Sequence, residues 1–387
     1  MSEERLNHLA NHGFEKMSRL SRVGPLKAFV FFAGSVLFSS LAGAQSAGEW
    51  EFMRSFQPRE YQCTRASEPP EIDGKLDDRA WQPAKWTQDF VDIEGPVRPN
   101  PRQATRAKMV WDSKGLYIAA EIQETHLVGT LTEHDCVIFQ DNDFEVFIDP
   151  DGDHHHYLEL ELNALNTTWD LYLPRPYKDA GSAENQWEFS GMKTAVHLDG
   201  TLNDPSDQDR GWTVEIFLPW SSLQKHSTRS FPPKLGDFIR MNFSRVEWQW
   251  EVVDGKYQKV KNTKEDNWVW SPQGIVDMHR PERWGYVVFV ESNLPRVETG
   301  TGGWIAVENK LMEIYHRQRV FHAQHGTYAK SLQELKIEPE ILATLEGVEI
   351  TTTTDGYLAQ LRVATKPGNG TRWRVRQDSK MWSESLE

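Results

Sequence analysis

The sequence predicts a mainly β protein, namely an antiparallel β-sandwich followed by a small α+β domain. Two observations support this fold class. From about residue 69 to residue 289, short runs of alternating apolar and polar residues are separated by turn residues, with hardly any helical periodicity. From residue 304 onward, a stretch with apolar residues at helical spacing precedes several strand-like runs. Many short strands separated by turn signals are typical of antiparallel sandwiches.

The strands of the sandwich are expected wherever the alternation is clear. Residues 104–111 and 116–122 alternate on either side of a Gly-containing turn, which predicts a β-hairpin. Further strands are expected at 144–149, 157–163, 169–173, 211–218, 238–246 and 284–289.

Alternation also assigns side chains to the two faces of each strand. In residues 157–163 the leucines share one face and the polar residues share the other, and two further strands repeat this division. The polar set includes Glu145, Glu159, Glu161, Asn163 and Asn242. One interpretation is a solvated outer face, which antiparallel sheets commonly have. The other is a surface that hydrogen-bonds sugar hydroxyls beside an aromatic platform.

The composition excludes several classes of protein. Of 387 residues 38% are hydrophobic and 11% aromatic, which is incompatible with a solvated coil. A net charge of −14 argues against nucleic acid as a partner, because phosphate binding needs clustered Lys and Arg. Two cysteines are too few for a disulfide scaffold or a Cys-rich zinc module. The 16 tryptophans indicate either a Trp-built core or stacking surfaces for a ligand.

The first part of the chain predicts export. Basic residues precede the apolar run 28–41, and Ala-Gly-Ala at 42–44 supplies a small-residue cleavage pattern. We therefore interpret residues 1–44 as a signal peptide and expect a periplasmic or extracellular protein. An uncleaved membrane anchor is the alternative, although the run is short for a span. No transmembrane span is expected after removal of the leader. Cys63 and Cys136 could pair in an oxidising compartment.

The rest of the chain divides by composition. We expect an N-terminal linker at 45–66, the sandwich at 67–291, a Gly-containing linker at 292–303 and a small α+β domain at 304–387. In the last of these, an amphipathic helix should end at Gly326, followed by a short helix at 331–335 and three strands. The spacing of Leu311, Ile314, Tyr315 and Gln318, followed by HGTY at 325–328, weakly resembles the globular part of pilin-like proteins.

Several motifs together resemble one family. They are EIDGKLDDRAW at 71–81, AKMVWD at 107–112, DNDFEVFID at 141–149, GWTVEI at 211–216 and Trp-Gly at 284–285. In this order they are similar to the family 9 carbohydrate-binding module over residues 67–291. The resemblance implies a DOMON-like β-sandwich of the jelly-roll type that binds sugars.

The resemblance also implies a binding site. In the family two tryptophans clamp a sugar ring, and Phe139 and Met278 stand at the corresponding positions. Trp268 or Trp270 could replace the second of these. The family's polar contacts map onto Glu145 and Asn163, whereas Glu161 stands where the family has an arginine.

A cluster of carboxylates predicts a metal site. Asp149, Asp151 and Asp153 alternate around a Gly, a pattern of oxygen ligands that suits calcium. Some family members carry structural calcium, so the resemblance permits it here. A hairpin turn that bears solvated charges is the alternative.

These observations favour an exported, non-catalytic protein that captures an oligo- or polysaccharide in support of carbohydrate catabolism. Phe139, with Trp268 or Trp270, would stack on the sugar, and the polar set would hydrogen-bond its hydroxyls. No catalytic residue is assigned. The first alternative is a glycoside hydrolase acting on O-glycosyl bonds, with Glu145 and Glu161 as its carboxyl pair. The second is a cell-envelope adaptor with a lost sugar site, whose C-terminal domain binds an envelope protein.

Overall fold

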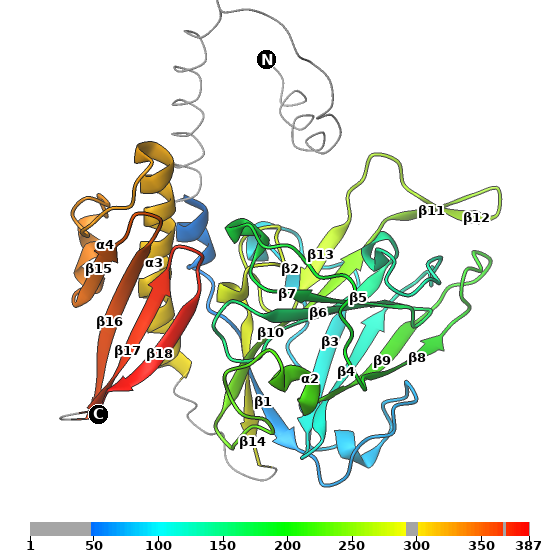
Figure 1. The fold of residues 1–387 in the computed structure, drawn as a ribbon. Coiled ribbons are helices and arrows are strands. Elements are labelled where there is room, and N and C mark those ends of the chain that lie inside the picture. Colours follow the sequence, from blue (N-terminus) through cyan, green and yellow to red (C-terminus); the bar gives the residue numbers. More distant parts are fainter. Residues whose placement is uncertain (1–47, 292–300, 367–368, 387) are drawn as a thin grey trace, which may run out of the picture.

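The computed structural model describes residues 48–291, 301–366 and 369–386. The expected leader, 1–44, and most of the linker 292–303 therefore lie outside the described residues. Figure 1 shows a β-sandwich beside a smaller domain in which a long helix accompanies a four-stranded sheet. This arrangement confirms the predicted fold class. Within the described residues, no helix is both long and apolar enough to cross a membrane.

The sandwich contains fourteen strands. They are β1 (Glu60–Arg65), β2 (Val91–Asp92), β3 (Thr105–Trp111), β4 (Gly115–Gln123), β5 (Asp143–Asp149), β6 (Tyr157–Asn163), β7 (Thr168–Leu173), β8 (Lys193–Asp199), β9 (Gly211–Pro219), β10 (Phe238–Glu247), β11 (Trp250–Val253), β12 (Lys256–Lys259), β13 (Asp266–Val269) and β14 (Gly285–Val290). Its helical turns are η2 (Arg79–Trp81), η3 (Gly95–Val97), η4 (Ile138–Gln140), η5 (Tyr177–Asp179), α2 (Trp220–Gln224) and η6 (Pro281–Arg283).

Twelve of these strands form one continuous sheet that curls into the two halves of the sandwich. The order is β7-β6-β5-β10-β14-β1-β3-β4-β9-β8, with β13 beside β10 and β2 beside β13. All pairings are antiparallel except those of β1. Strand β1 runs parallel to β14 along Glu60–Thr64 and parallel to β3 at Thr64 and Arg65. It therefore joins the two halves.

This role of β1 corrects the interpretation of residues 45–66 as a linker. Residues 60–65 belong to the sheet, and residues 48–53 form a helical turn. Trp50 and Met53 of that turn are buried in the core of the C-terminal domain. The segment therefore contributes to the cores of both domains. Its sequence did not indicate this, because its few apolar side chains pack against residues from distant parts of the chain.

The main core lies between the two halves of the sandwich. Leu158, Leu160 and Leu162 of β6 are fully buried in it, which confirms the alternation expected for this strand. Strand β10 contributes Ile239, Met241 and Phe243 to the same core. The opposite faces of these strands therefore point away from the main core, as predicted.

The C-terminal domain consists of α3 (Thr301–His325), α4 (Pro339–Thr344) and a sheet of four antiparallel strands in chain order. The strands are β15 (Val348–Thr352), β16 (Tyr357–Lys366), β17 (Asn369–Arg376) and β18 (Met381–Leu386). Helix α3 ends before Gly326, whose φ of +70° places it in the left-handed region that commonly ends helices. Residues 331–335 form turns instead of the expected short helix.

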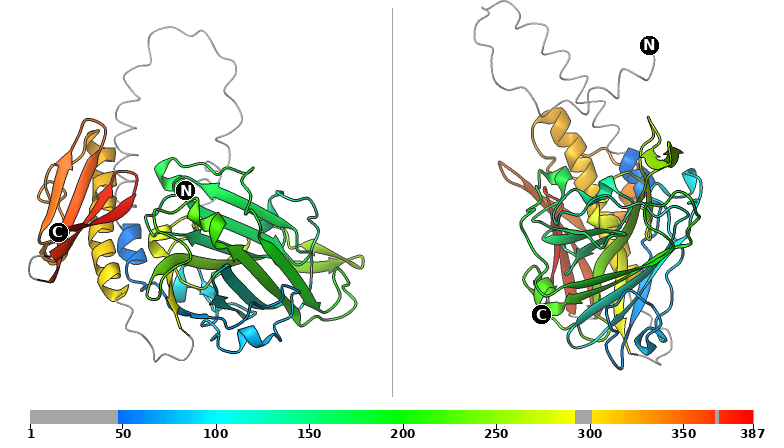
Figure 2. Two further views of the ribbon diagram at one scale, coloured as in Figure 1. Left: turned by 60° about the horizontal axis from the view of Figure 1, so that its bottom comes forward. Right: turned by 90° about the vertical axis from the view of Figure 1, so that its right-hand side faces the viewer.

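Helix α3 lies between its own sheet and the sandwich (Figures 1 and 2). It contributes Leu311, Ile314 and Tyr315 to the core of the C-terminal domain. It also presents two polar groups to the sandwich, namely the carboxylate of Glu308, which is 1% exposed, and the hydroxyl of Tyr315. Arg240 of β10 pairs with this carboxylate, so the C-terminal domain docks on the polar side of the sheet.

Both cysteines are free thiols in this structure. Cys63 lies on β1 in the main core and is fully buried, whereas Cys136 is half-buried in the loop before η4.

Candidate functional site

A cavity of about 340 Å³ lies over the polar side of the sheet. Residues that are directly opposite one another on neighbouring strands form its floor. Trp169 of β7 is opposite Glu161 of β6, and Glu161 is opposite Glu145 of β5. Asn267 of β13 completes the floor beyond β10. The lining of the cavity thus comes from alternate residues of adjacent strands, which the period of the strands places on one face.

Two aromatic rings form one wall of the cavity. Phe139 lies in η4, just before β5, and Trp169 lies at the start of β7. Their ring centroids are 6.4 Å apart with the planes inclined by 30°. The indole N–H of Trp169 is buried and has no hydrogen-bond partner among the described residues. The wall therefore combines apolar ring faces with one free donor.

The floor is acidic and buried. The residual exposure is 5% for Glu145, 3% for Glu159 and 2% for Glu161, and the adjacent Asp143 is fully buried. The carboxylate of Glu161 accepts a hydrogen bond of 3.0 Å from the backbone N–H of Phe139. The solvated outer face that the sequence permitted is thus incorrect for these positions, because η4, η5 and the loop before β14 cover them.

Burial raises the pKa of four carboxyl groups in and beside this floor, those of Asp143, Glu145, Glu159 and Glu161. The pKa of Glu145 rises from 4.5 to about 7 because burial disfavours its charged form. Burial and then the neighbouring carboxyl groups raise the pKa values of Asp143, Glu159 and Glu161 well above their usual range. These four groups are an electrostatically costly cluster that the fold nevertheless holds together.

The second wall is positioned by the domain junction. Tyr177 of η5 and His279 form it, with ring centroids 4.4 Å apart at 74°. Burial lowers the pKa of His279 to about 4, so this imidazole is neutral at pH 7. The backbone N–H of His279 donates to Asp277, whose other oxygen accepts from Arg280 at 2.8 Å.

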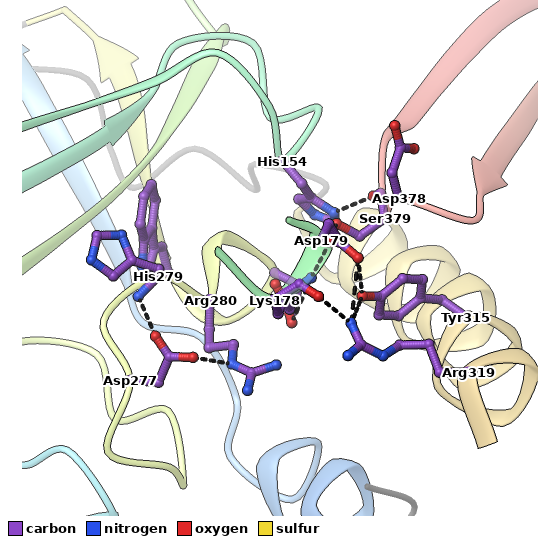
Figure 3. Close-up of polar contacts among 12 residues, drawn as sticks. His154, Lys178, Asp179, Asp277, His279, Arg280, Tyr315, Arg319, Asp378 and Ser379 are labelled. Atoms are coloured by element: carbon purple, nitrogen blue, oxygen red, sulfur yellow. Dashed lines mark hydrogen bonds and ion pairs between the residues drawn. The ribbon is translucent and has the colours of Figure 1, made fainter. Parts of the chain in front are cut away.

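Figure 3 shows how this wall is connected to the C-terminal domain. Asp179, two residues after Tyr177, accepts hydrogen bonds of 2.6 Å from the hydroxyl groups of Tyr315 on α3 and Ser379 beyond β17. Arg319 of α3 donates to the backbone carbonyl of Lys178 at 2.8 Å. Each contact fixes η5, so the second domain helps to position the second wall.

Comparison with known proteins identifies the family. The family described as carbohydrate family 9 binding domain-like matches residues 72–291. The chain belongs to this family. The predicted resemblance is thereby confirmed, and carbohydrate binding is the function that the family supports.

Two curated enzymes contain a related segment. The exoglucanase XynX of Acetivibrio thermocellus is 25% identical over 154 residues, which are 40% of this chain and 12% of that enzyme. The endo-1,4-β-xylanase A of Thermoanaerobacterium saccharolyticum is 27% identical over 154 residues, which are 40% of this chain and 11% of the enzyme. The alignments thus span only a small part of the length of these relatives.

Solved structures align with part of this chain at low identity. A candidate carbohydrate-binding protein of Bacteroides uniformis has a TM-score of 0.45 and 16% identity, covering 60% of this chain and all of that chain (100%). A family 9 carbohydrate-binding module of Caldicellulosiruptor kristjanssonii in complex with glucose has a TM-score of 0.40 and 14% identity, covering 62% and 100%. The same module in complex with cellotriose aligns with the same values.

Of the seven ligand-binding residues predicted from the sequence, the structure brings Phe139, Glu145 and Glu161 together in the cavity. The amide of Asn163 is fully buried and donates to the backbone carbonyl of Leu131. Asn242 is also fully buried and donates to the backbone carbonyl of Ser271 at 2.9 Å. Neither amide is available to a ligand in this arrangement, because the loops that cover the sheet already use their hydrogen-bonding capacity.

The two tryptophans expected as a platform lie in the core instead. Trp268 is 3% and Trp270 2% exposed, and both pack in the main core. The cause is register: Val269 is opposite Ser244 of β10 on the cavity side, so its two neighbours must point to the opposite face. The correction therefore follows from strand pairing, which the sequence alone did not specify.

Trp169 takes the place beside Phe139, and Glu159, Asn267 and His279 also line the cavity. The sequence already placed Trp169 on a strand and Glu159 on the polar face. The signal that could have found Trp169 is the pairing of 157–163 with 168–173 across a short connection, which puts this indole opposite Glu161.

The predicted calcium cluster is assembled in space. Asp149, Asp151 and Asp153 each place an oxygen within 4.8 Å of the others, and all three side chains are buried. Oxygen donors of this kind suit calcium. Oδ1 of Asp151 has no hydrogen-bond partner among the described residues, whereas Lys380 lies 2.9 Å from Asp153. The residues fit a hard cation, and calcium at this loop stays a prediction.

A larger cavity of about 510 Å³ lies between this loop and the C-terminal sheet. Its rings pack on one another, with Trp304 and Trp373 centroids 4.3 Å apart at 89°. Two of its three cations form ion pairs, Arg376 with Asp378 and Lys380 with Asp153, and Arg229 donates to the backbone carbonyl of Phe238. The smaller cavity, which offers an uncommitted indole N–H and a carboxylate floor, is the better candidate site for a sugar.

Proposed function

We propose that this protein captures a saccharide without cleaving it, in the cavity between the Phe139–Trp169 wall and the Tyr177–His279 wall. The observation that carries the proposal is the combination of stacked aromatic rings and hydrogen-bonding carboxyl groups in one cavity. Apolar ring faces suit the C–H faces of a sugar ring, and the carboxyl groups suit its hydroxyls. The cavity volume of about 340 Å³ lies at the small end for ligand sites and suits the end of a chain.

Free polar atoms support this assignment. The indole N–H of Trp169 and one oxygen of Glu159 are buried without a partner among the described residues. Buried polar groups normally have partners, so unpaired ones in a cavity are suited to a ligand's hydroxyl groups. A saccharide offers both donors and acceptors and could satisfy the two groups at once.

A non-catalytic role fits the family, whose description is that of a binding domain. The segments shared with the exoglucanase and the xylanase make up 12% and 11% of those enzymes. We propose that this chain likewise contributes binding, and that it does so after export, in support of carbohydrate catabolism. The predicted leader at 1–44 supports the exported location.

Isothermal titration calorimetry with glucose, cello-oligosaccharides and xylo-oligosaccharides tests the proposal. We expect one saccharide class to bind, and Trp169→Ala to weaken its affinity at least about tenfold, or about 1.4 kcal/mol. Trp86→Ala is the matched control, because this indole is also half-buried but packs against Arg106 and Lys108 on the other half of the sandwich.

The same titrations define the contrary result. If no saccharide produces heat with the wild-type protein, or if the control variant loses as much affinity as Trp169→Ala, the cavity is not the sugar site. Release of reducing sugar that disappears in Glu145→Gln would instead favour the glycoside hydrolase. Specific capture of an envelope protein by the full chain, with no sugar binding, would favour the adaptor.

A further inference from the structure

The floor of the cavity, together with Asp143 buried beside it, has an unusual charge balance. Asp143, Glu145, Glu159 and Glu161 bring four carboxyl groups together, and each side chain is at most 5% exposed. Within residues 48–291, 301–366 and 369–386, none of them forms an ion pair with a Lys, Arg or His. Buried carboxylates normally have a cationic partner, because removing their charge from water costs free energy.

The geometry of three of these groups fits one metal ion. Asp143, Glu145 and Glu161 each place an oxygen within 4.8 Å of the other two. Oxygens that ligate one Ca²⁺ at about 2.3–2.6 Å cannot be more than about 5 Å apart, so the cluster has the size of a calcium site. The three residues come from adjacent strands, with Glu145 directly opposite Glu161, so the sheet itself sets this spacing.

A second observation indicates that a ligand is missing from this cluster. One oxygen of Asp143 accepts a hydrogen bond of 3.0 Å from the backbone N–H of Val246, but its other oxygen is buried without a partner in the part of the chain that the structure describes. One oxygen of Glu159 is unpartnered in the same way. Asp143 is fully buried and Glu159 is 3% exposed, so solvent cannot be assumed to satisfy either oxygen.

We propose that Asp143, Glu145 and Glu161 bind a Ca²⁺ ion in the floor of this cavity and that the ion coordinates hydroxyl groups of the bound saccharide. The proposal rests on the proposed function and specifies how the site recognises its ligand. Calcium takes six to eight oxygen ligands, and three carboxylates leave positions open toward the cavity. Neighbouring hydroxyls of a sugar would fill these positions while its ring contacts Phe139 and Trp169. This site is separate from the loop that carries Asp149, Asp151 and Asp153.

Calcium binding is measured first without a sugar. Calorimetry with CaCl₂ compares the wild-type full chain with Glu161→Gln and Asp151→Asn. We expect Glu161→Gln to lower the calcium affinity of the floor site at least tenfold. Asp151→Asn should leave the calcium affinity of the floor site unchanged. Both substitutions replace a carboxylate by an amide of nearly equal size, so they match each other as controls for the two acidic clusters.

Thermal unfolding gives a readout that does not require the sugar. Without calcium, Glu161→Gln should have a higher Tm than the wild type, because it removes one buried carboxylate that lacks a cation. Calcium should raise the Tm of the wild type. It should also raise the Tm of Asp151→Asn, in which the floor site is intact. The calcium-induced rise seen in Asp151→Asn should be absent from Glu161→Gln. Equal calcium-induced shifts in wild type and Glu161→Gln would overturn the floor site.

Saccharide titrations with calcium and with EDTA then connect the ion to recognition. We expect EDTA to weaken saccharide binding at least tenfold in the wild type and in Asp151→Asn. Saccharide binding that is unchanged by EDTA would overturn this inference and leave the proposed function intact. If calcium binding depends on Glu161 but no saccharide binds, the calcium site stands and the proposed function is overturned. Calcium-independent binding of an amino sugar would also overturn the inference, since an ammonium group would then supply the missing charge.

Discussion

Arg240 of β10 and Glu308 of α3 form an ion pair across the domain junction, with their side chains 2% and 1% exposed. The same carboxylate lies 2.8 Å from Nε2 of His154 and accepts a hydrogen bond of 2.9 Å from the hydroxyl of Tyr286. A single side chain of the C-terminal domain is therefore surrounded by polar groups from three segments of the sandwich. We therefore expect the docking of α3 to depend on Glu308 being ionised.

The first prediction concerns the pH dependence of this junction. Burial raises the pKa of Glu308, but Arg240 and His154 outweigh it and lower the pKa from 4.5 to about 2. A carboxyl group whose pKa is lower in the folded state stabilises the protein above its unfolded pKa and loses this effect as pH falls. The contribution of Glu308 should therefore be full above about pH 4.5 and vanish toward pH 2.

Denaturant unfolding of the wild type and Glu308→Gln from pH 7 to pH 2 measures this contribution. At pH 7 the variant should be less stable by about 3–5 kcal/mol, because it leaves the buried Arg240 without its counter-charge. The difference should shrink as the pH falls below 4.5. Glu384→Gln is a control, because its ion pair with Arg374 is half-exposed at the edge of the C-terminal sheet. If the difference in stability between the wild type and Glu308→Gln does not change with pH, then the ion pair with Arg240 is not the source of the stability that Glu308 contributes.

The second prediction concerns the connection between the C-terminal domain and the cavity. Asp179→Ala removes the acceptor of the Tyr315 and Ser379 hydroxyls and releases η5, which carries Tyr177. Saccharide affinity should fall by about tenfold, which corresponds to about 1.4 kcal/mol. Calorimetry on Asp179→Ala, Tyr177→Ala and the double variant checks this, and the two effects should not add, because both act through one wall.

Asp199→Ala provides the matched control for this experiment. It removes the exposed ion pair between Asp199, the last residue of β8, and Arg210, and neither residue lines the cavity. It should leave saccharide affinity unchanged. Fully additive effects of Asp179→Ala and Tyr177→Ala would mean that Asp179 does not act by positioning Tyr177.

The third prediction separates core tryptophans from site tryptophans. Trp270→Ala removes a 2% exposed indole from the main core and should destabilise the fold by about 3–5 kcal/mol. Trp169→Ala removes a half-buried ring. Compared with Trp270→Ala, it should lower the free energy of unfolding less and weaken saccharide binding more. Unfolding by urea and calorimetry on the same samples compare the two. Greater loss of affinity in folded Trp270→Ala than in Trp169→Ala would reverse the assignment of their roles.

The period of the strands was enough to predict much of this fold. Alternation in residues 157–163 placed the leucines in the core and Glu159 and Glu161 on the other face, as observed. The helical spacing after residue 304 and Gly326 predicted α3 and its end. These features are local, because the backbone geometry of a strand or a helix decides them over a few residues.

The composition of the site was decided by tertiary structure. Phe139 and Trp169 meet because η4 packs beside the β6–β7 pair, and Trp268 and Trp270 are buried because β13 pairs with β10 in one particular register. The sequence by itself determined the family, eight of the fourteen strands of the sandwich and which carboxyl groups share a face. Only the tertiary structure decided that this face is buried and enclosed by two aromatic walls, because burial depends on contacts between segments far apart in the chain.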